Sequence, residues 1–243
     1  MRVMLVHGWH MTGLELVLLG LRLRRAGFVV ERFRYRSRRE APREAGRRLA
    51  DQLREIDGSV ALVGHSLGGH VIRHAVAGLA GSTEPDGGMA VPSSRSDTSA
   101  AACGARRPEA RVSAVVFLGS PLAGSAVARR LFEQGGWRRR WLGCAWSGGL
   151  DGRSPLVRGV PTLMIAGVRP GWSRWLTHGL AIPNDGTVAL SETRAEDVVE
   201  HRSFATGHMG LVVNRLVAQT LIEFLLCIAD GETPGIRRES ASD

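Results

Sequence analysis

Two patterns of hydrophobic and polar residues alternate along the chain, one typical of strands and one typical of helices. They predict that strands and helices alternate in the fold. Strand candidates, most of them short apolar runs, lie at 3–6, 28–30, 59–63, 112–118, 162–166 and 198–204. Apolar residues recur every three or four positions, as on one face of a helix, at 14–21, 42–56, 71–79 and 209–229. Strands that alternate with helices form right-handed βαβ units, so we expect an α/β fold. Its central sheet should be mostly parallel, with helices on both faces.

Two segments interrupt this alternation. Residues 82–110 are rich in Ser, Gly, Pro, Ala and Asp and show no period, which predicts a long, disordered surface loop. Residues 122–156 instead carry Trp137, Trp141 and Trp146. This segment is either a helical excursion packed on the core or a lid whose aromatic rings line an apolar substrate pocket. We favour the lid because of where the candidate catalytic residues, described below, lie.

These patterns divide the chain into one core and an insertion. Residues 1–121 and 157–230 form the core, 122–156 the lid, and 231–243 a flexible C-terminal tail. The long apolar segment 209–229 carries a polar stripe of Arg215, Gln219 and Glu223, each four residues from the next. That spacing predicts an amphipathic helix packed on the core rather than a membrane span.

The cysteines and the N-terminus favour a cytoplasmic location. Cys103, Cys144 and Cys227 are odd in number and have neither disulfide-framework nor zinc-site spacing. The first residues lead almost directly into an apolar strand and lack the features of a signal peptide. We therefore expect a reducing compartment, and neither a metal nor another cofactor.

The charged residues exclude catalytic mechanisms that need lysine and favour anionic binding partners. The 243 residues include 32 cationic side chains and 23 acidic ones, a formal net charge of +9, and every cation is arginine. Without lysine there is no Walker A loop, Schiff base or Ser-Lys pair. The arginines are scattered and match no nucleic-acid-reading motif, so we expect no nucleic acid partner. A basic surface, with Arg138–Arg140 between two lid tryptophans, favours an acidic carrier protein or an anionic membrane surface.

One short motif points to nucleophilic catalysis. Gly64 to Gly68 match G-x-S-x-G, between the apolar run 59–63 and a helix. A sharp strand-to-helix turn there would expose the hydroxyl of Ser66. A serine hydroxyl is a weak nucleophile, so it needs a base and an acid that orients the base.

Two later residues fit those needs. His208 follows the last predicted strand, and the ends of parallel strands converge at one edge of the sheet. Asp185 lies in an Asn-Asp-Gly turn after strand 162–166, whereas the rival Asp197 lies at the start of a strand, at the wrong edge. An oxyanion needs backbone donors, and we expect the amides of Leu67 and Trp9, with His10 as second choice to Trp9. His70 and His74, on the helix after the motif, should be packed or solvated.

With these residues in place, the sequence resembles the small lipase- and esterase-like members of the α/β-hydrolase superfamily. The matching motifs are LVHGW at 5–9, GHSLGG at 64–69, LGSPLAGS at 118–125, NDGTV at 184–188 and GHMG at 207–210. The resemblance implies Ser66 as nucleophile, His208 as base and Asp185 as its orienting acid. It also implies a fold shortened at its N-terminus, since the chain begins at what would be the third strand.

The sequence thus predicts a serine hydrolase that cleaves carboxylic esters of apolar acyl groups through an acyl-enzyme. An alternative is a thioesterase or esterase that acts on acyl chains held by a carrier protein. From another class, a catalytically inactive binding module would keep the same fold. The acyl chain length, the leaving group and the oligomeric state stay open.

Overall fold

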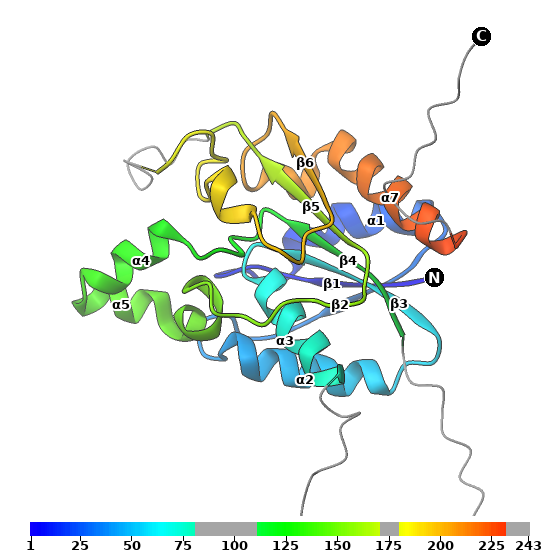
Figure 1. Ribbon diagram of the computed structural model, residues 1–243, viewed down its shortest axis with the longest axis horizontal. Helices are drawn as coiled ribbons and strands as arrows, with labels where there is room; N and C mark the ends of the chain where they lie inside the picture. Colours follow the sequence, from blue (N-terminus) through cyan, green and yellow to red (C-terminus); the bar gives the residue numbers. More distant parts are fainter. Residues whose placement is uncertain (81–110, 171–179, 232–243) are drawn as a thin grey trace, which may run out of the picture.

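A six-stranded parallel sheet forms the centre of the molecule (Figure 1). The computed structural model describes residues 1–80, 111–170 and 180–231. In sheet order the strands are β2 (Val29–Phe33), β1 (Arg2–Val6), β3 (Ser59–His65), β4 (Arg111–Leu118), β5 (Thr162–Gly167) and β6 (Glu200–Phe204). Every neighbouring pair is parallel, so all six carboxyl ends meet at one edge. The predicted α/β fold class is confirmed.

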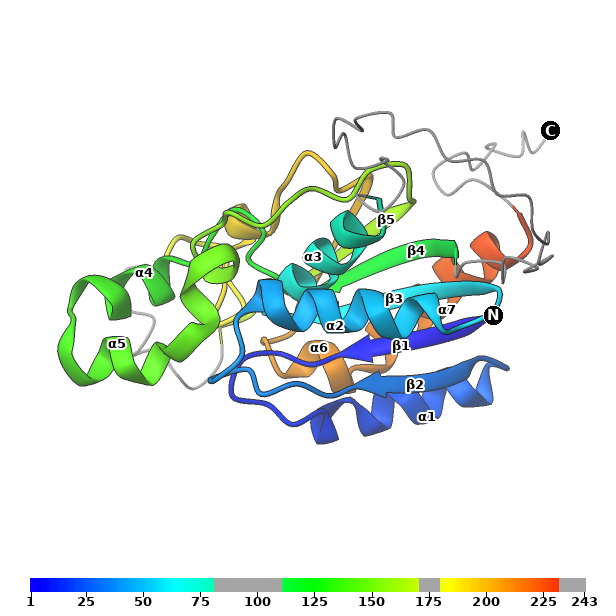
Figure 2. The same cartoon turned by 90° about the horizontal axis from the view of Figure 1, so that it is seen from below.

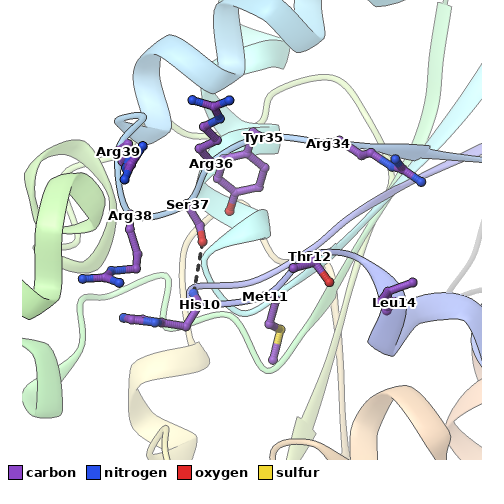
Figure 3. Close-up of a pocket in the computed structure, with 10 residues that line it drawn as sticks. All are labelled: His10, Met11, Thr12, Leu14, Arg34, Tyr35, Arg36, Ser37, Arg38 and Arg39. Carbon is purple, nitrogen blue, oxygen red and sulfur yellow. Dashed lines mark hydrogen bonds between the residues drawn. The ribbon is translucent and has the colours of Figure 1, made fainter.

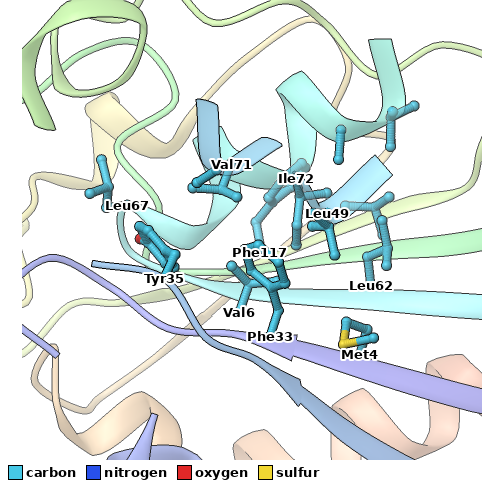
Figure 4. Close-up of a cluster of buried hydrophobic side chains, with 14 of the residues drawn as sticks. Met4, Val6, Phe33, Tyr35, Leu49, Leu62, Leu67, Val71, Ile72 and Phe117 are labelled. Atoms are coloured by element: carbon cyan, nitrogen blue, oxygen red, sulfur yellow. The ribbon is translucent and has the colours of Figure 1, made fainter. Parts of the chain in front are cut away.

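Helices cover both faces of the sheet (Figure 2). One face carries α2 (Pro42–Arg54) and α3 (Gly68–Ala80); the other carries α1 (Val17–Arg25), α6 (Gly210–Val213) and α7 (Arg215–Ala229). Alternate residues of β1 supply the two cores: Met4 and Val6 face α2 and α3, whereas Val3 and Leu5 face α1 and α7. Figure 4 shows the first of these clusters, in which Phe33 and Phe117 join Met4 and Val6. The inner strands such as β3 and β5 are buried on both sides, and this requires the near-continuous apolar runs that the sequence shows there.

The segment 122–156, called the cap below, is helical. It contains α4 (Ala126–Glu133), α5 (Gly136–Leu142), a 3₁₀ turn (Gly143–Ala145) and a wide turn (Trp146–Leu150). Figure 2 shows α4 and α5 beyond the carboxyl edge of the sheet, to the left of the strands. The cap therefore lies beside the loops in which the candidate catalytic residues occur.

A buried ion pair ties both ends of the cap to the core. The guanidinium of Arg73, on α3, pairs with the carboxylate of Asp197, and both side chains are 1% exposed. The same guanidinium donates to the carbonyl of Leu122 and to the hydroxyl of Ser154, each at 3.2 Å. Asp197 also accepts the amide of Val157 at 2.9 Å. This pair therefore joins α3, the two ends of the cap and the segment before β6.

The predicted single helix over 209–229 is wrong in one respect. The structure has two helices, α6 and α7, because Asn214 takes an extended conformation with ψ of 135°. Its side chain accepts hydrogen bonds from the amides of Leu216 and Val217 and so caps α7. The polar stripe of Arg215, Gln219 and Glu223 is exposed, which confirms the amphipathic helix.

Several predictions fall outside the described residues. The loop 82–110 lies wholly there, and so does the predicted tail apart from its first residue. Among the helices that are described, none is long and apolar enough to cross a membrane.

Candidate active site

Ser66 lies in a sharp turn between β3 and α3. Its φ of 53° is left-handed, a region that a residue with a side chain rarely adopts. The turn is tight because a Cβ on Gly68 would come 2.4 Å from the carbonyl oxygen of Val6, and one on Gly64 would come 2.7 Å from the amide nitrogen of Gly69. Only glycine fits these two positions. The G-x-S-x-G pattern thus has a steric origin, and it holds Ser66 at the carboxyl end of β3.

His208 and Asp185 form a buried hydrogen-bonded pair. His208 Nδ1 lies 2.6 Å from Asp185 Oδ2, while Oδ1 of the same carboxylate accepts the amides of Thr187 at 2.9 Å and Val188 at 2.7 Å. The amide of His208 also donates to the carbonyl of Asp185 at 2.9 Å. Because an ionised carboxylate only accepts hydrogen bonds, Nδ1 carries the proton and Nε2 is left with a lone pair.

The end of β4 lies between Ser66 and this pair. The amide of Ser66 donates to the carbonyl of Leu118 at 2.9 Å. At the next residue, Gly119 with φ of 57°, a Cβ would lie 3.2 Å from His208 Nδ1 and 3.3 Å from Asp185 Oδ2. Ser66 and the His208–Asp185 pair therefore adjoin the same two residues of β4. No hydrogen bond joins the Ser66 hydroxyl to the His208 ring, although the structure describes both side chains.

Gly119 is a further residue of the site, and no catalytic motif in the sequence assigns it a role. The sequence feature that points to Gly119 is a glycine directly after a buried strand, within the LGSPLAGS motif. The position favours glycine, because its φ is left-handed and because a Cβ would lie 2.7 Å from Leu211 Cδ1. Gly119 therefore makes room for the imidazole and carboxylate to approach the end of β4.

His65 is a second neighbour that the sequence analysis left without a role. Its ring centroid lies 4.8 Å from that of His208, and its Nε2 lies 3.3 Å from the His208 carbonyl oxygen. Since a carbonyl only accepts, Nε2 carries the proton. Burial, reinforced by the nearby His208, lowers the pKa of His65 to about 3. His65 therefore supports the His208 backbone without placing a second positive charge beside it.

Two backbone amides near Ser66 are without hydrogen-bond partners among the described residues. The loop after β1 packs on the serine, because a Cβ on Gly8 would lie 3.0 Å from Ser66 Cβ. In the described part of the chain, neither the amide of Trp9 nor that of Leu67 donates a hydrogen bond. The amide of His10 instead donates to the hydroxyl of Ser37 at 3.0 Å. Of the two expected donors in this loop, only Trp9 is therefore available to an oxyanion.

The three cap tryptophans have different surroundings. Trp141 packs edge-on against Trp9, with ring centroids 4.5 Å apart, so α5 contacts the loop after β1. Trp137 is 68% exposed. Trp146 stacks on Phe132 at 4.6 Å and packs against the core on the α2 and α3 side. Trp141 is thus the cap tryptophan that touches the candidate site, and Trp146 packs within the cap.

The competing acid and histidines are engaged elsewhere. The carboxylate of Asp197 is held by Arg73, as described above. His70 is buried with Nδ1 2.8 Å from the Ser154 hydroxyl, and burial lowers its pKa to about 3. Nε2 of His74 lies 2.6 Å from the carbonyl oxygen of Gly148. Across residues 1–80, 111–170 and 180–231, no three His, Cys, Asp or Glu side chains are grouped as metal ligands.

Comparisons with known proteins agree with this geometry at the level of the fold. No curated protein matches the chain in sequence. Among solved structures, a lipase of Bacillus licheniformis in its mature form is similar with a TM-score of 0.67 and 17% identity, over 92% of this chain and 91% of that one. A thioesterase from the prodiginine biosynthetic pathway of Streptomyces coelicolor is similar with a TM-score of 0.54 and 14% identity, over 94% of this chain and 90% of that one.

The model of a protein family covers most of the chain. The Alpha/beta hydrolase family model matches residues 3–220, from β1 into α7. That span includes the Ser66 turn, the His208–Asp185 pair and the cap. The chain therefore belongs to the alpha/beta hydrolase family.

Proposed function

We propose that the protein is a serine hydrolase that cleaves carboxylic esters of apolar acyl groups. One observation carries the proposal: a serine in a strained strand-to-helix turn adjoins the same strand end as a buried histidine–aspartate pair. Ser66 is the nucleophile, His208 the base and Asp185 the acid that orients the base. The hydroxyl of Ser66 turns about one bond, and we expect this rotation to complete its hydrogen bond to Nε2 when substrate binds.

The reaction proceeds in two halves. Nε2 of His208 takes the Ser66 proton as Oγ bonds to the ester carbonyl carbon, and the carbonyl oxygen becomes an oxyanion held by the amides of Trp9 and Leu67. The carbon–oxygen bond to the alcohol then breaks, and the alcohol leaves with the proton from His208. Water next gives a proton to His208 and attacks the acyl-enzyme. The acid is released, and Ser66 regains its proton.

The preference for apolar acyl groups rests on the aromatic side chains near the serine. Trp9 and Trp141 pack together beside Gly8, and Trp137 is exposed on the same helix as Trp141. Large exposed aromatic rings are costly to leave in water and are typical of surfaces that bind apolar groups. We therefore expect activity to rise as the acyl chain lengthens from acetyl.

A thioesterase is the second candidate, supported by the fold shared with a thioesterase of Streptomyces coelicolor and by the exposed Arg138 and Arg140 on the cap. The same serine, histidine and aspartate would act on a thioester, with a thiol as the leaving group. We propose a cytoplasmic location for either activity, because Cys144 is a free, exposed thiol, which a reducing compartment preserves.

A fluorophosphonate probe and p-nitrophenyl butyrate together test the proposal. We expect the probe to label Ser66, and Ser66→Ala to lower kcat by roughly 10⁶-fold and abolish labelling. The matched control is Ser59→Ala, at the opposite, exposed end of the same strand, which should keep both. Labelling that persists in Ser66→Ala would contradict the proposal. A folded wild type with no turnover of any ester or thioester would favour an inactive binding module.

A further inference from the structure

A groove rich in arginine lies next to the candidate active site. It has a volume of about 610 Å³ and is lined by Arg38 and Arg39, which follow β2, and by Trp137, Arg140 and Trp141 of α5. We call it the arginine groove. Arg38 and Arg39 also line an adjoining pocket of about 710 Å³ beside the loop after β1 (Figure 3). Figure 3 shows the side chains of Arg38 and His10 side by side.

Among the residues that the structure describes, the cations of the groove have no acidic partners. None of the ion pairs of the described residues involves Arg38, Arg39 or Arg140. Glu40, the acidic residue next to Arg39, is held by Arg48 at 2.7 Å. The other arginines of α5 are engaged differently, since Arg138 stacks on Trp137 and Arg139 on Phe132. Three unpaired guanidinium groups around one groove create a local excess of positive charge that favours an anion.

Hydrogen bonds fix the walls of the groove to one another. The amide of Cys144, just after α5, donates to the carbonyl of Arg38 at 3.2 Å. Gly143 lies so close to the same carbonyl that a Cβ there would be 2.3 Å from its oxygen. On the other side, the hydroxyl of Ser37 accepts the amide of His10. The arginines are thus carried by segments that are already held in place, which lowers the entropic cost of binding a ligand.

The groove begins close to Ser66. Gly8 packs on Ser66, Trp9 packs on Trp141, and Trp141 lines the groove. The path from Ser66 to the groove therefore runs over two neighbouring residues, Gly8 and Trp9, and the ring of Trp141. A substrate whose carbonyl lies at Ser66 could therefore place its other end between the arginines.

We propose that the arginine groove binds a phosphate group carried by the alcohol or thiol part of the substrate. Guanidinium groups match phosphate oxygens with paired hydrogen bonds, and the tryptophans offer an apolar wall to the stem that joins phosphate to ester. The inference rests on the proposed hydrolase function and adds a substrate class to it: acyl esters or thioesters with a phosphorylated leaving group.

Two pairs of substrates that differ only in phosphate test the inference. One pair is glyceryl monobutyrate and its glycerol 3-phosphate counterpart; the other is S-butyryl pantetheine and its 4′-phosphate. We expect kcat/KM to be about tenfold or more higher for the phosphorylated member of at least one pair. The double variant Arg38→Gln, Arg140→Gln should remove this preference and leave the neutral substrates unchanged. Arg25→Gln, an exposed arginine on α1, is the matched control and should keep it.

The possible outcomes test phosphate binding in the arginine groove separately from the proposed hydrolase activity. A preference within the glycerol pair alone indicates a lipid-type phosphate, one within the pantetheine pair alone a carrier-type phosphate, and either supports the inference. Equal kcat/KM within both pairs overturns it. Calorimetric titration of Ser66→Ala with glycerol 3-phosphate and phosphopantetheine gives a readout without catalysis. Binding that the arginine variants abolish would uphold the groove even if no ester were cleaved, whereas cleavage without binding or preference would refute the groove alone.

Discussion

Replacing Asp185 by asparagine tests the proposed triad with little change of shape. In the structure Oδ1 of Asp185 accepts the amides of Thr187 and Val188, and Oδ2 lies 2.6 Å from His208 Nδ1. The oxygen of an asparagine can keep both turn hydrogen bonds. Its NH₂ group then faces Nδ1, which must become an acceptor. The proton of the imidazole moves to Nε2, and the ring can no longer take a proton from Ser66.

The expected loss of kcat follows from this change of tautomer. In enzymes with this arrangement, the same exchange lowers kcat by about 10⁴-fold, which corresponds to roughly 5.4 kcal/mol of transition-state stabilisation. The free energy of unfolding should change far less, because the turn around residue 185 keeps its hydrogen bonds. We therefore expect a folded variant that binds substrate and turns it over very slowly.

Asp197→Asn is the matched contrast, since Asp197 is an equally buried aspartate whose partner is Arg73. Removing its charge leaves a buried guanidinium uncompensated and should lower the free energy of unfolding by about 3–5 kcal/mol. Steady-state hydrolysis of p-nitrophenyl butyrate and urea unfolding at pH 7 measure both effects. An Asp185→Asn variant with wild-type kcat would refute the reasoning, and so would a folded Asp197→Asn variant with the larger loss of kcat.

Three further predictions concern other features of the fold. Gly119→Ala should lower kcat by about tenfold, because the new methyl group pushes the His208 ring by a few tenths of an ångström; unchanged kcat in a folded variant would argue against the close packing. His70 is neutral in the fold, because burial lowers its pKa to about 3 from an ordinary 6.5. Its contribution to the free energy of unfolding is therefore complete above pH 6.5 and is lost as the pH falls towards 3. Urea unfolding should show wild type losing about 2 kcal/mol more than His70→Gln between pH 7 and 5, and equal losses would contradict this. Asn214→Ala should cost about 1 kcal/mol in calorimetry through loss of the α7 cap, and an unchanged Tm would count against that cap.

The sheet could be predicted from sequence because burial on both faces leaves little freedom in composition. Strands such as β3 and β5 have almost no exposed residues, so they are continuous apolar runs. The apolar period runs on through Asn214, so the sequence pattern predicts one helix where the structure has two. The signal was local: an asparagine can end one helix and cap the next, and its side chain accounts for two amides of α7.

The residues at 66, 185 and 208 could be proposed because motif, chain order and sheet edge agree. Their supporting neighbours could not. A buried histidine such as His65 has no periodic signature, and its effect on His208 depends on a ring contact between residues 143 positions apart. The arginine groove joins Arg38 to Arg140, and the ion pair joins Arg73 to Asp197. Such pairings arise only from the folded arrangement of loops and helices.

A crystal structure of the protein treated with an alkyl phosphonate tests the central claim most directly. We expect a covalent bond between phosphorus and Ser66 Oγ, with a phosphonyl oxygen within hydrogen-bond distance of the amides of Trp9 and Leu67. His208 Nε2 should lie within hydrogen-bond distance of Oγ or of the leaving-group position, while Nδ1 keeps its hydrogen bond to Asp185. A phosphonate on another residue, or an adduct at Ser66 whose oxygen points away from both amides, would contradict the account.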